Sequence, residues 1–173
     1  MWTTMDSPLG ELWIVASDGA LTAVDFVERS VPDNPHSSAA WAAARADGRP
    51  LGERADDDPL LREAVRQLAE YFAGDRTEFD LPLRPEGTEF QKRVWEKLRA
   101  IPYGEVSSYG EIARRLGMTG HGSRAVGLAN GRNPIAIVIP CHRVVGADGS
   151  LTGYGGGIER KQKLLELEQQ SLF

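Results

Sequence analysis

The chain has 173 residues, of which 41% are hydrophobic and 26% are charged, a composition typical of a folded protein with one large or two small domains. No apolar run approaches the ~20 residues that cross a bilayer, and the first residues lack the basic and apolar regions of a signal peptide, so we expect no contact with membranes. A single cysteine excludes an internal disulfide and, with only three histidines, argues against a structural zinc site, so we expect a protein of the reducing cytoplasm without a metal or other cofactor.

The net charge of −5 is divided unevenly along the chain. Residues 1–83 carry 7 Lys and Arg against 16 Asp and Glu, whereas residues 84–173 carry 13 against 9, which gives −9 and +4. This difference predicts that an anionic partner meets the C-terminal half, although an ordinary scatter of surface charge explains it equally well.

The first 27 residues predict β-structure. Residues 12–15 and 21–26 are apolar or β-branched, and Ser17-Asp18-Gly19 between them is typical of a hairpin turn. Residues 31–57 are rich in Pro, Asp, Gly, Ala and Ser, which indicates a long surface loop with a short helix near residues 39–45.

A helix is predicted after this loop, with Asp58 as its N-cap, Pro59 at its first position and Gly74 at its end. Apolar side chains recur at helical spacing between these ends. Residues 77–83 predict a last strand before a proline-bounded linker. The linker and the change of charge together predict a domain boundary near residue 84, which gives domains 1–83 and 84–173.

Three helices are predicted in the C-terminal half. Thr88 and Gln91 form a capping box for the first, the second begins at Ser108, and the third covers residues 123–130. The second and third helices, separated by a glycine-containing turn, have the helix-turn-helix pattern, which fits DNA contact and a purely structural pair equally well.

The third helix carries small residues and one long side chain, Arg124. Small residues at Ala125, Gly127 and Ala129 allow a close approach to another surface, from which Arg124 would project. The alternative is that Arg124 is a solvated charge at the start of the helix.

Residues 135–139 form a continuous apolar run that predicts a buried strand, and Cys141-His142 follow it. A lone cysteine beside a histidine is a candidate nucleophile, because the imidazole can take the proton of the thiol. A free cysteine that is merely a small buried side chain is the alternative. In the last helix, residues 158–168, Glu168 shares part of the face of Leu164 and Leu165, so its carboxylate needs a buried partner, and His142 would suit it. A solvated Glu168 near the chain end fits the spacing equally well.

Five motifs in this half resemble one family. They are Pro140-Cys141-His142-Arg143-Val144, Gly104–Tyr109, Ser123–Gly127, Asn130–Pro134 and Gly153–Gly157. Together they resemble the O6-alkylguanine-DNA alkyltransferases, also called methylated-DNA–protein-cysteine methyltransferases, over about residues 87–168. The resemblance is weaker in the N-terminal half and absent from residues 33–57.

The resemblance implies the α/β fold of that family, an N-terminal ribonuclease-H-like domain followed by a C-terminal helix-turn-helix, winged-helix-like domain. It implies a DNA repair protein that acts as a monomer on double-stranded DNA carrying O6-alkylguanine, with O4-alkylthymine left open. By resemblance Cys141 accepts the alkyl group irreversibly, once per molecule. His142 takes its proton through a water, Glu168 orients His142, and Asn133 braces the backbone of the site.

The resemblance also implies which residues contact the substrate. Arg124 enters the duplex in place of the extruded nucleotide, Tyr109 crowds the target phosphate and lies near guanine N3, and Tyr154 walls the base pocket. The carbonyls of Cys141 and Val144 accept from the guanine amino group, while the Gly155 amide faces O6. The helix that would lie in the minor groove supplies the further contacts Ser123, Ala125, Ala129 and Arg132.

Two departures and two alternatives accompany this interpretation. Some relatives carry an N-terminal zinc site, and this chain lacks the cysteines for it. Others carry a second, regulatory acceptor domain, which we do not expect here because the 173 residues hold no second cysteine. A helix-turn-helix protein that binds damaged DNA without chemistry is one alternative, and Cys141 argues against it. The other is a Cys/His hydrolase, which would turn over repeatedly.

Overall fold

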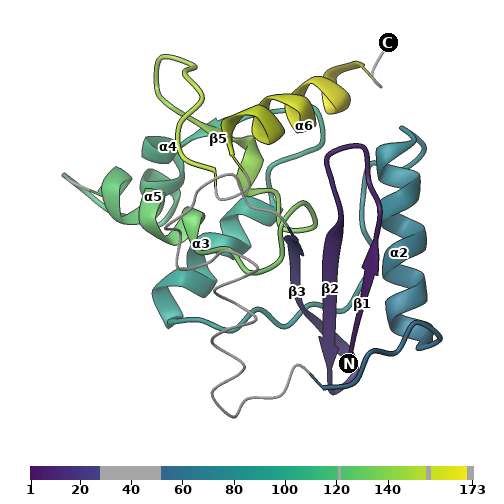
Figure 1. The fold of residues 1–173 in the computed structure, drawn as a ribbon. Coiled ribbons are helices and arrows are strands. Elements are labelled where there is room, and N and C mark those ends of the chain that lie inside the picture. The colour runs from purple at the N-terminus through teal and green to yellow at the C-terminus, as the bar shows by residue number, and fades with distance from the viewer. Residues whose placement is uncertain (28–51, 121, 155–156, 171–173) are drawn as a thin grey trace.

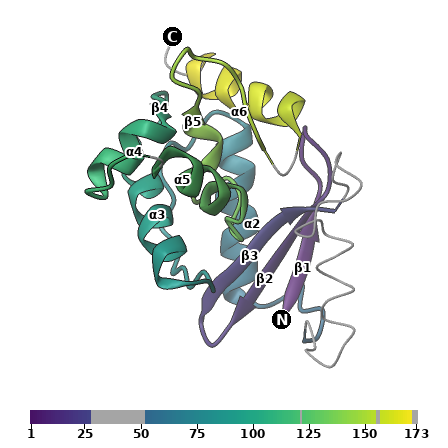
Figure 2. The same ribbon diagram turned by 90° about the vertical axis from the view of Figure 1, so that its left-hand side faces the viewer.

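The computed structural model describes residues 1–27, 52–120, 122–154 and 157–170. A three-stranded antiparallel sheet and one helix form the N-terminal part, and short helices form the C-terminal part (Figures 1 and 2). Within the described residues no helix is both long enough and apolar enough to span a membrane.

The sheet has the order β1-β2-β3, with β1 at Trp2–Met5, β2 at Leu12–Ser17 and β3 at Ala20–Phe26. The predicted hairpin is confirmed: β2 and β3 pair antiparallel, and Asp18 and Gly19 adopt the positive φ angles of a tight turn. Most side chains of β3 are buried, and Val24 of this strand forms a bridge with Ile135 of the C-terminal part, so β3 is the strand that meets that part.

Helix α2, Pro59–Phe72, packs against β1 and β2. The predicted N-cap is confirmed, since the Asp58 carboxylate accepts a hydrogen bond from the Leu61 amide at 3.0 Å. Of the predicted loop at 31–57, only residues 52–57 are described, and the short helix expected near 39–45 lies outside the described residues. Residues 53–55 run beside β1, where the Trp2 amide donates to Glu53 and the Trp2 carbonyl accepts from Ala55.

The strand predicted at residues 77–83 is wrong, because only Leu83 forms a bridge, with Leu21 of β3. Pro82 has no amide hydrogen for a ladder. The side chain of Gln67 in α2 instead satisfies the Asp80 amide and carbonyl at 2.9 and 3.0 Å, so side-chain hydrogen bonds hold this extended segment.

The C-terminal part begins with α3, Glu89–Arg99, whose capping box of Thr88 and Gln91 is confirmed. A two-residue strand β4, Ser107–Ser108, leads into α4, Tyr109–Arg115, and α5 follows at Gly122–Gly131. The predicted pair of short helices is therefore present. Helix α5 packs on α4 and α3, and the indole Nε1 of Trp95 donates to the Ala129 carbonyl at 2.9 Å.

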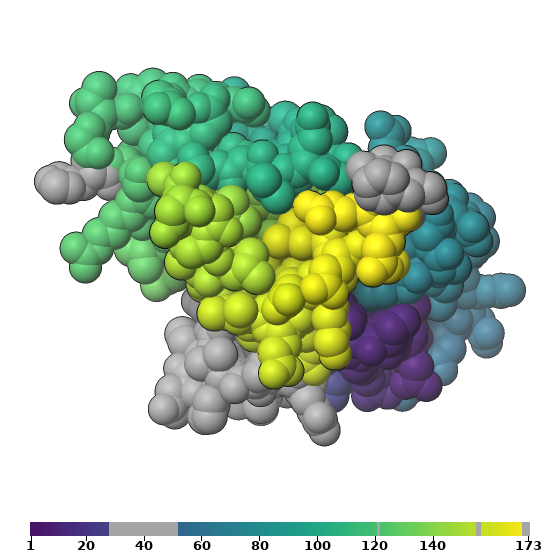
Figure 3. Space-filling view, turned by 90° about the horizontal axis from the view of Figure 1, so that it is seen from above, coloured from purple at the N-terminus to yellow at the C-terminus, as the bar shows by residue number. Residues whose placement is uncertain are grey.

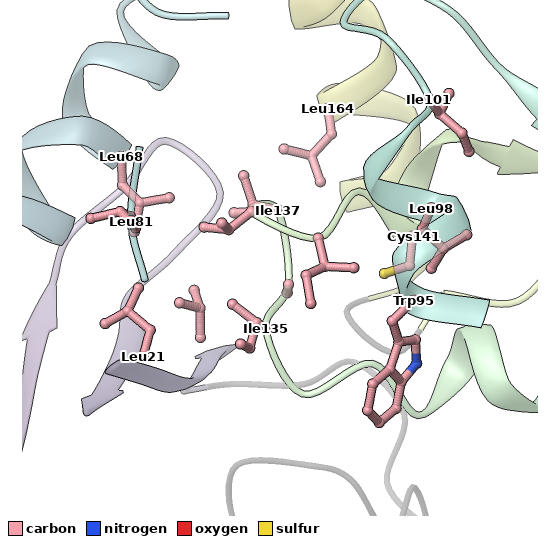
Figure 4. Packing of buried hydrophobic residues seen from close by; sticks show 14 of the residues in the cluster. Leu21, Leu68, Leu81, Trp95, Leu98, Ile101, Ile135, Ile137, Cys141 and Leu164 are labelled. Carbon is pink, nitrogen blue, oxygen red and sulfur yellow. The ribbon is translucent and has the colours of Figure 1, made fainter. Parts of the chain in front are cut away.

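The chain ends with a 3-10 turn η1 at Cys141–Arg143, a strand β5 at Val144–Val145 paired in parallel with β4, and helix α6 at Ile158–Gln170. One continuous core joins both parts of the molecule, with the segment of Ile135 and Ile137 between the sheet side and α3 (Figure 4). Helix α6 lies across the top of both parts (Figure 3).

Candidate active site

The buried strand predicted at residues 135–139 is wrong, although the segment is buried. Only Ile135 forms a bridge, with Val24 of β3, and the chain then turns, so that the Ile139 amide donates to the Ile135 carbonyl at 3.0 Å. Ile137 has φ +72°, a conformation rare for a β-branched residue, so the surroundings must hold this turn.

Asn133 holds this turn from inside. Its side-chain oxygen accepts from the Ile135 amide at 3.0 Å, and its side-chain nitrogen donates to the Ile139 carbonyl at 2.8 Å. The side chain therefore closes a loop that local backbone bonds alone would leave partly unsatisfied. The turn delivers Cys141 directly into η1.

Cys141 is in no disulfide and is 6% exposed. It lies in the cluster that contains Trp95 and Leu98 of α3 (Figure 4). Its carbonyl accepts hydrogen bonds from the Val144 amide and from the side-chain nitrogen of Asn130 at 3.3 Å. The backbone around the sulfur is thus fixed on both sides.

His142 and Glu168 are brought together, as the helical spacing of α6 allowed. The two side chains are 0% and 1% exposed, and Nε2 of His142 lies 2.7 Å from Oε2 of Glu168. Burial lowers the pKa of His142 despite the nearby carboxylate, so the neutral imidazole is favoured at physiological pH. A neutral ring that donates from Nε2 leaves Nδ1 as a proton acceptor, and this buried nitrogen has no hydrogen-bond partner among the described residues.

Arg143 supplies the charge that Glu168 needs inside the protein. Its Nε donates to Oε1 at 2.8 Å and its Nη2 to Oε2 at 3.1 Å. Burial alone would raise the pKa of Glu168, but the hydrogen bonds and charge of His142 and Arg143 outweigh it and lower this pKa to about 2. Glu168 is therefore ionised at neutral pH.

Lys161 lies about two turns before Glu168 on α6 and binds the backbone of the site. Its ammonium group is buried and donates to the carbonyls of Val144 at 2.5 Å and Thr152 at 2.7 Å. Burial lowers the pKa of Lys161 to about 8, with the Cys141 thiol as an opposing influence.

Two tyrosines complete the surroundings of the thiol. Tyr109 begins α4, is half-buried, and donates its hydroxyl hydrogen to the Thr152 carbonyl at 3.1 Å. Burial raises the pKa of Tyr109, with the charge of Cys141 as a lesser cause, so this hydroxyl stays protonated at neutral pH. Tyr154 is 8% exposed and belongs to the same apolar cluster as Cys141. Gly155 lies outside the described residues.

Helix α5 presents charge and small residues to the outside. Ser123, Arg124 and Arg132 are exposed and Ala125 is half-buried, as a surface contact requires. Ala129 is only 4% exposed, because it faces α3 and its carbonyl accepts from Trp95. The role of Ala129 as a DNA contact, which the resemblance implies, therefore stays a prediction, with only a small exposed area to carry it.

The sequence interpretation missed four buried residues of the site, Tyr71, Asn130, Arg143 and Lys161. Arg143 stood within the motif around Cys141, and Lys161 lies seven positions before Glu168, hence on the same face of α6. Among the described residues no group of three or more His, Cys, Asp or Glu side chains is placed to hold a metal ion.

Comparison with known proteins places nearly the whole chain. The family model described as 6-O-methylguanine DNA methyltransferase, ribonuclease-like domain, matches residues 1–85, and that described as 6-O-methylguanine DNA methyltransferase, DNA binding domain, matches residues 89–170. These matches confirm the expected fold class.

Similar proteins and structures cover the same length. The methylated-DNA–protein-cysteine methyltransferase of Mycolicibacterium paratuberculosis is 48% identical over 98% of this chain and 92% of its own, and that of Methanosarcina acetivorans is 45% identical over 96% and 97%. The crystal structure of Mycobacterium tuberculosis O6-methylguanine methyltransferase aligns with a TM-score of 0.80 at 48% identity, covering 98% and 93% of the two chains. The structure of the Mycobacterium tuberculosis OGT protein in complex with DNA aligns with 0.78 at 46% identity and the same coverage.

Proposed function

This chain belongs to the methylated-DNA–protein-cysteine methyltransferase family and is a DNA-repair alkyltransferase, and we propose that it moves the alkyl group of an O6-alkylated guanine onto its own Cys141. The observation that carries the proposal is the buried series Cys141, His142 and Glu168. A reduced thiol adjoins a neutral histidine in the sequence, and that histidine is hydrogen-bonded to an ionised carboxylate.

The first step is activation of the thiol. Nδ1 of His142 takes the Cys141 proton through a bridging water, while Nε2 keeps its hydrogen and its bond to Glu168. Glu168 fixes the ring orientation and stabilises the imidazolium that forms. Lys161, which is buried and donates to the Val144 carbonyl, adds a positive charge that stabilises the thiolate.

The thiolate then attacks the alkyl carbon. A carbon–sulfur bond forms as the bond between that carbon and O6 breaks, and the bonding electron pair stays on the guanine. The proton taken from the thiol balances the charge when it is returned to the base, which leaves guanine in the DNA. The thioether has no easy reverse reaction, so each chain acts once.

Access to the buried sulfur requires that the base leave the stack. The chain binds DNA, and we propose a duplex whose damaged nucleotide is extruded into the site at a cost of a few kcal/mol. Exposed Arg124 on α5 fills the vacated position, and Ser123, Ala125 and Arg132 contact the DNA backbone and minor groove. Their exposure supports these roles.

The base pocket is assigned to Tyr109, Tyr154, Val144 and the glycine-rich segment that contains Gly155. The Val144 carbonyl accepts from Lys161, and one further lone pair remains for the guanine amino group. The Cys141 carbonyl already accepts from the Val144 amide and Asn130. The guanine amino group therefore competes with the Asn130 side chain for that oxygen, and the 3.3 Å hydrogen bond from Asn130 is weak enough to be displaced.

We further propose the boundary between domains near residue 84, action as a monomer, and a cytoplasmic location. The thiol of Cys141, which is in no disulfide, supports the last proposal, because an alkyl acceptor must stay reduced.

Mass spectrometry of the intact protein separates this function from binding without chemistry. After incubation with a duplex that contains O6-methylguanine, wild type should gain the mass of one methyl group in place of one hydrogen, and Cys141→Ser should not. An unchanged wild-type mass with tight binding would favour the damaged-DNA-binding alternative.

A further inference from the structure

Glu168 receives a hydrogen bond from the N-terminal part of the chain. Tyr71, in the last turn of α2, donates its hydroxyl hydrogen to Oε2 of Glu168 at 2.7 Å, although the two residues are 97 positions apart. Both side chains are buried. The C-terminal portion of α6 lies over the C-terminal end of α2, so this contact joins the two parts of the molecule (Figures 1 and 3).

The position of the Tyr71 hydroxyl is set by the packing of its ring. The ring lies 5.5 Å from that of Phe79 and 6.2 Å from that of Tyr103 between ring centroids, and it is 0% exposed. Burial, followed by the negative charge of Glu168, raises the pKa of Tyr71 well above its ordinary value. The phenol is therefore a fixed donor at every working pH.

The Glu168 carboxylate is held by the side chains around it. Arg143 bonds both oxygens, whereas Tyr71 and His142 share Oε2 at 2.7 Å each. Three of these four hydrogen bonds meet at Oε2 and one at Oε1, so Oε2 is held by donors from α2 and η1 together. Any rotation of the carboxylate away from His142 would break the bond to Tyr71 as well.

We propose that Tyr71 is a positioning residue of the transfer site, whose hydroxyl holds Oε2 of Glu168 where that oxygen accepts the hydrogen bond of His142. The inference rests on the proposed relay through His142. The N-terminal domain thereby supplies one hydrogen-bond donor to the relay. Through Glu168 this donor acts on His142, the proton acceptor of the reaction, so the two domains are coupled there.

The charged and titratable groups around this oxygen come from several elements. Those that act on Tyr71, His142 or Glu168 are Tyr71 of α2, His142 and Arg143 of η1, Tyr154 of the glycine-rich segment, and Lys161 of α6. Arg143 and Lys161 both lower the pKa of His142, and only Glu168 opposes them. Loss of the Tyr71 donor leaves Oε2 more negative, which stabilises the imidazolium and raises the pKa of His142.

The test is the pH dependence of transfer by Tyr71→Phe, which keeps the ring and removes only the hydroxyl. Single-turnover rates are measured at saturating O6-methylguanine duplex from acid to alkaline pH. We expect the acid limb of the profile to move to higher pH by roughly half a unit to one unit, because a more basic His142 stays protonated up to a higher pH. Alkaline rates should stay within about twofold of wild type. Phe79→Leu is the matched control: it loosens the same aromatic packing without touching the carboxylate, and its profile should stay in place.

The outcomes separate this inference from the relay itself. A Tyr71→Phe profile superimposable on wild type, with a displaced Glu168→Gln profile, overturns the role of Tyr71 and leaves the relay intact. If both variants follow wild type, the relay is wrong. If Phe79→Leu moves the acid limb of the profile as far as Tyr71→Phe does, loosened aromatic packing explains the shift without the Tyr71 hydroxyl, and the inference fails. Thermal melts of all variants confirm that folded protein is compared.

Discussion

Replacing Glu168 by Gln should destabilise the protein strongly at neutral pH and much less in acid. The substitution keeps the shape of the side chain but removes the charge that Arg143 and His142 face, and Arg143 is then a buried cation without a counter-charge. Removal of one partner from a buried ion pair costs about 3–5 kcal/mol.

The pKa of Glu168 gives an independent magnitude. Folding lowers it from the ordinary value of 4.5 to about 2, and the side chain is 1% exposed, so solvent screens little of the interaction. A shift of this size corresponds to roughly 3 kcal/mol of folding free energy. Because the folded pKa is the lower one, this stability is complete above pH 4.5 and is lost as the pH falls toward 2.

Urea unfolding of wild type and Glu168→Gln between pH 7 and pH 3 measures this contribution. We expect a difference of about 3 kcal/mol at pH 7 that falls to about half or less at pH 3. Glu166→Gln makes the same chemical change at an exposed position of α6 and should differ from wild type by less than about 0.5 kcal/mol. A Glu168→Gln difference below about 1 kcal/mol, or one that does not change with pH, would refute the buried charge pair.

Three further predictions concern transfer. Cys141→Ala should bind the O6-methylguanine duplex nearly as wild type does in a gel-shift assay yet transfer nothing, and measurable transfer by this variant would contradict the assignment of the acceptor. Arg124→Ala should lose roughly tenfold or more in repair rate on duplex DNA but little on free O6-benzylguanine, because only the duplex has a stack to fill; equal losses on both substrates would mean that Arg124 supports the fold. In folded Glu168→Gln, transfer should be slowed at neutral pH and approach wild type as the pH rises past the ordinary thiol pKa of about 8.5, since the thiolate then forms without the relay; superimposable rates across a pH series would eliminate the relay.

The sequence predicted best what neighbouring residues decide. The caps Asp58 and Thr88, and the hairpin between β2 and β3, depend on side chains and turns a few residues apart, and all three are confirmed. The apolar run at 135–139 failed because burial does not specify extension. Asn133 and the positive φ of Ile137 fold this run into a turn, and no local pattern carries that information.

The site was predictable in part because a motif concentrates its chemistry. Cys141 and His142 are adjacent in sequence, and helical spacing allowed Glu168 to face inward, although a solvated side chain fitted that spacing equally well. Tyr71 could not be found in this way, since its hydroxyl meets Glu168 across 97 residues through the packing of α2 under α6. Likewise, the small size of Ala129 fitted a groove contact and a close helix crossing equally well, and only the fold shows it against α3.

The most direct test of the central claim is a count of methyl groups at completion. Wild-type protein is incubated with an excess of duplex containing O6-methylguanine, restored guanine is counted, and digested peptides are sequenced by mass spectrometry. We expect one guanine restored per protein chain and the methyl group on the peptide that contains Cys141. Restoration of several guanines per chain, or a methyl group on any other residue, would contradict irreversible transfer to Cys141.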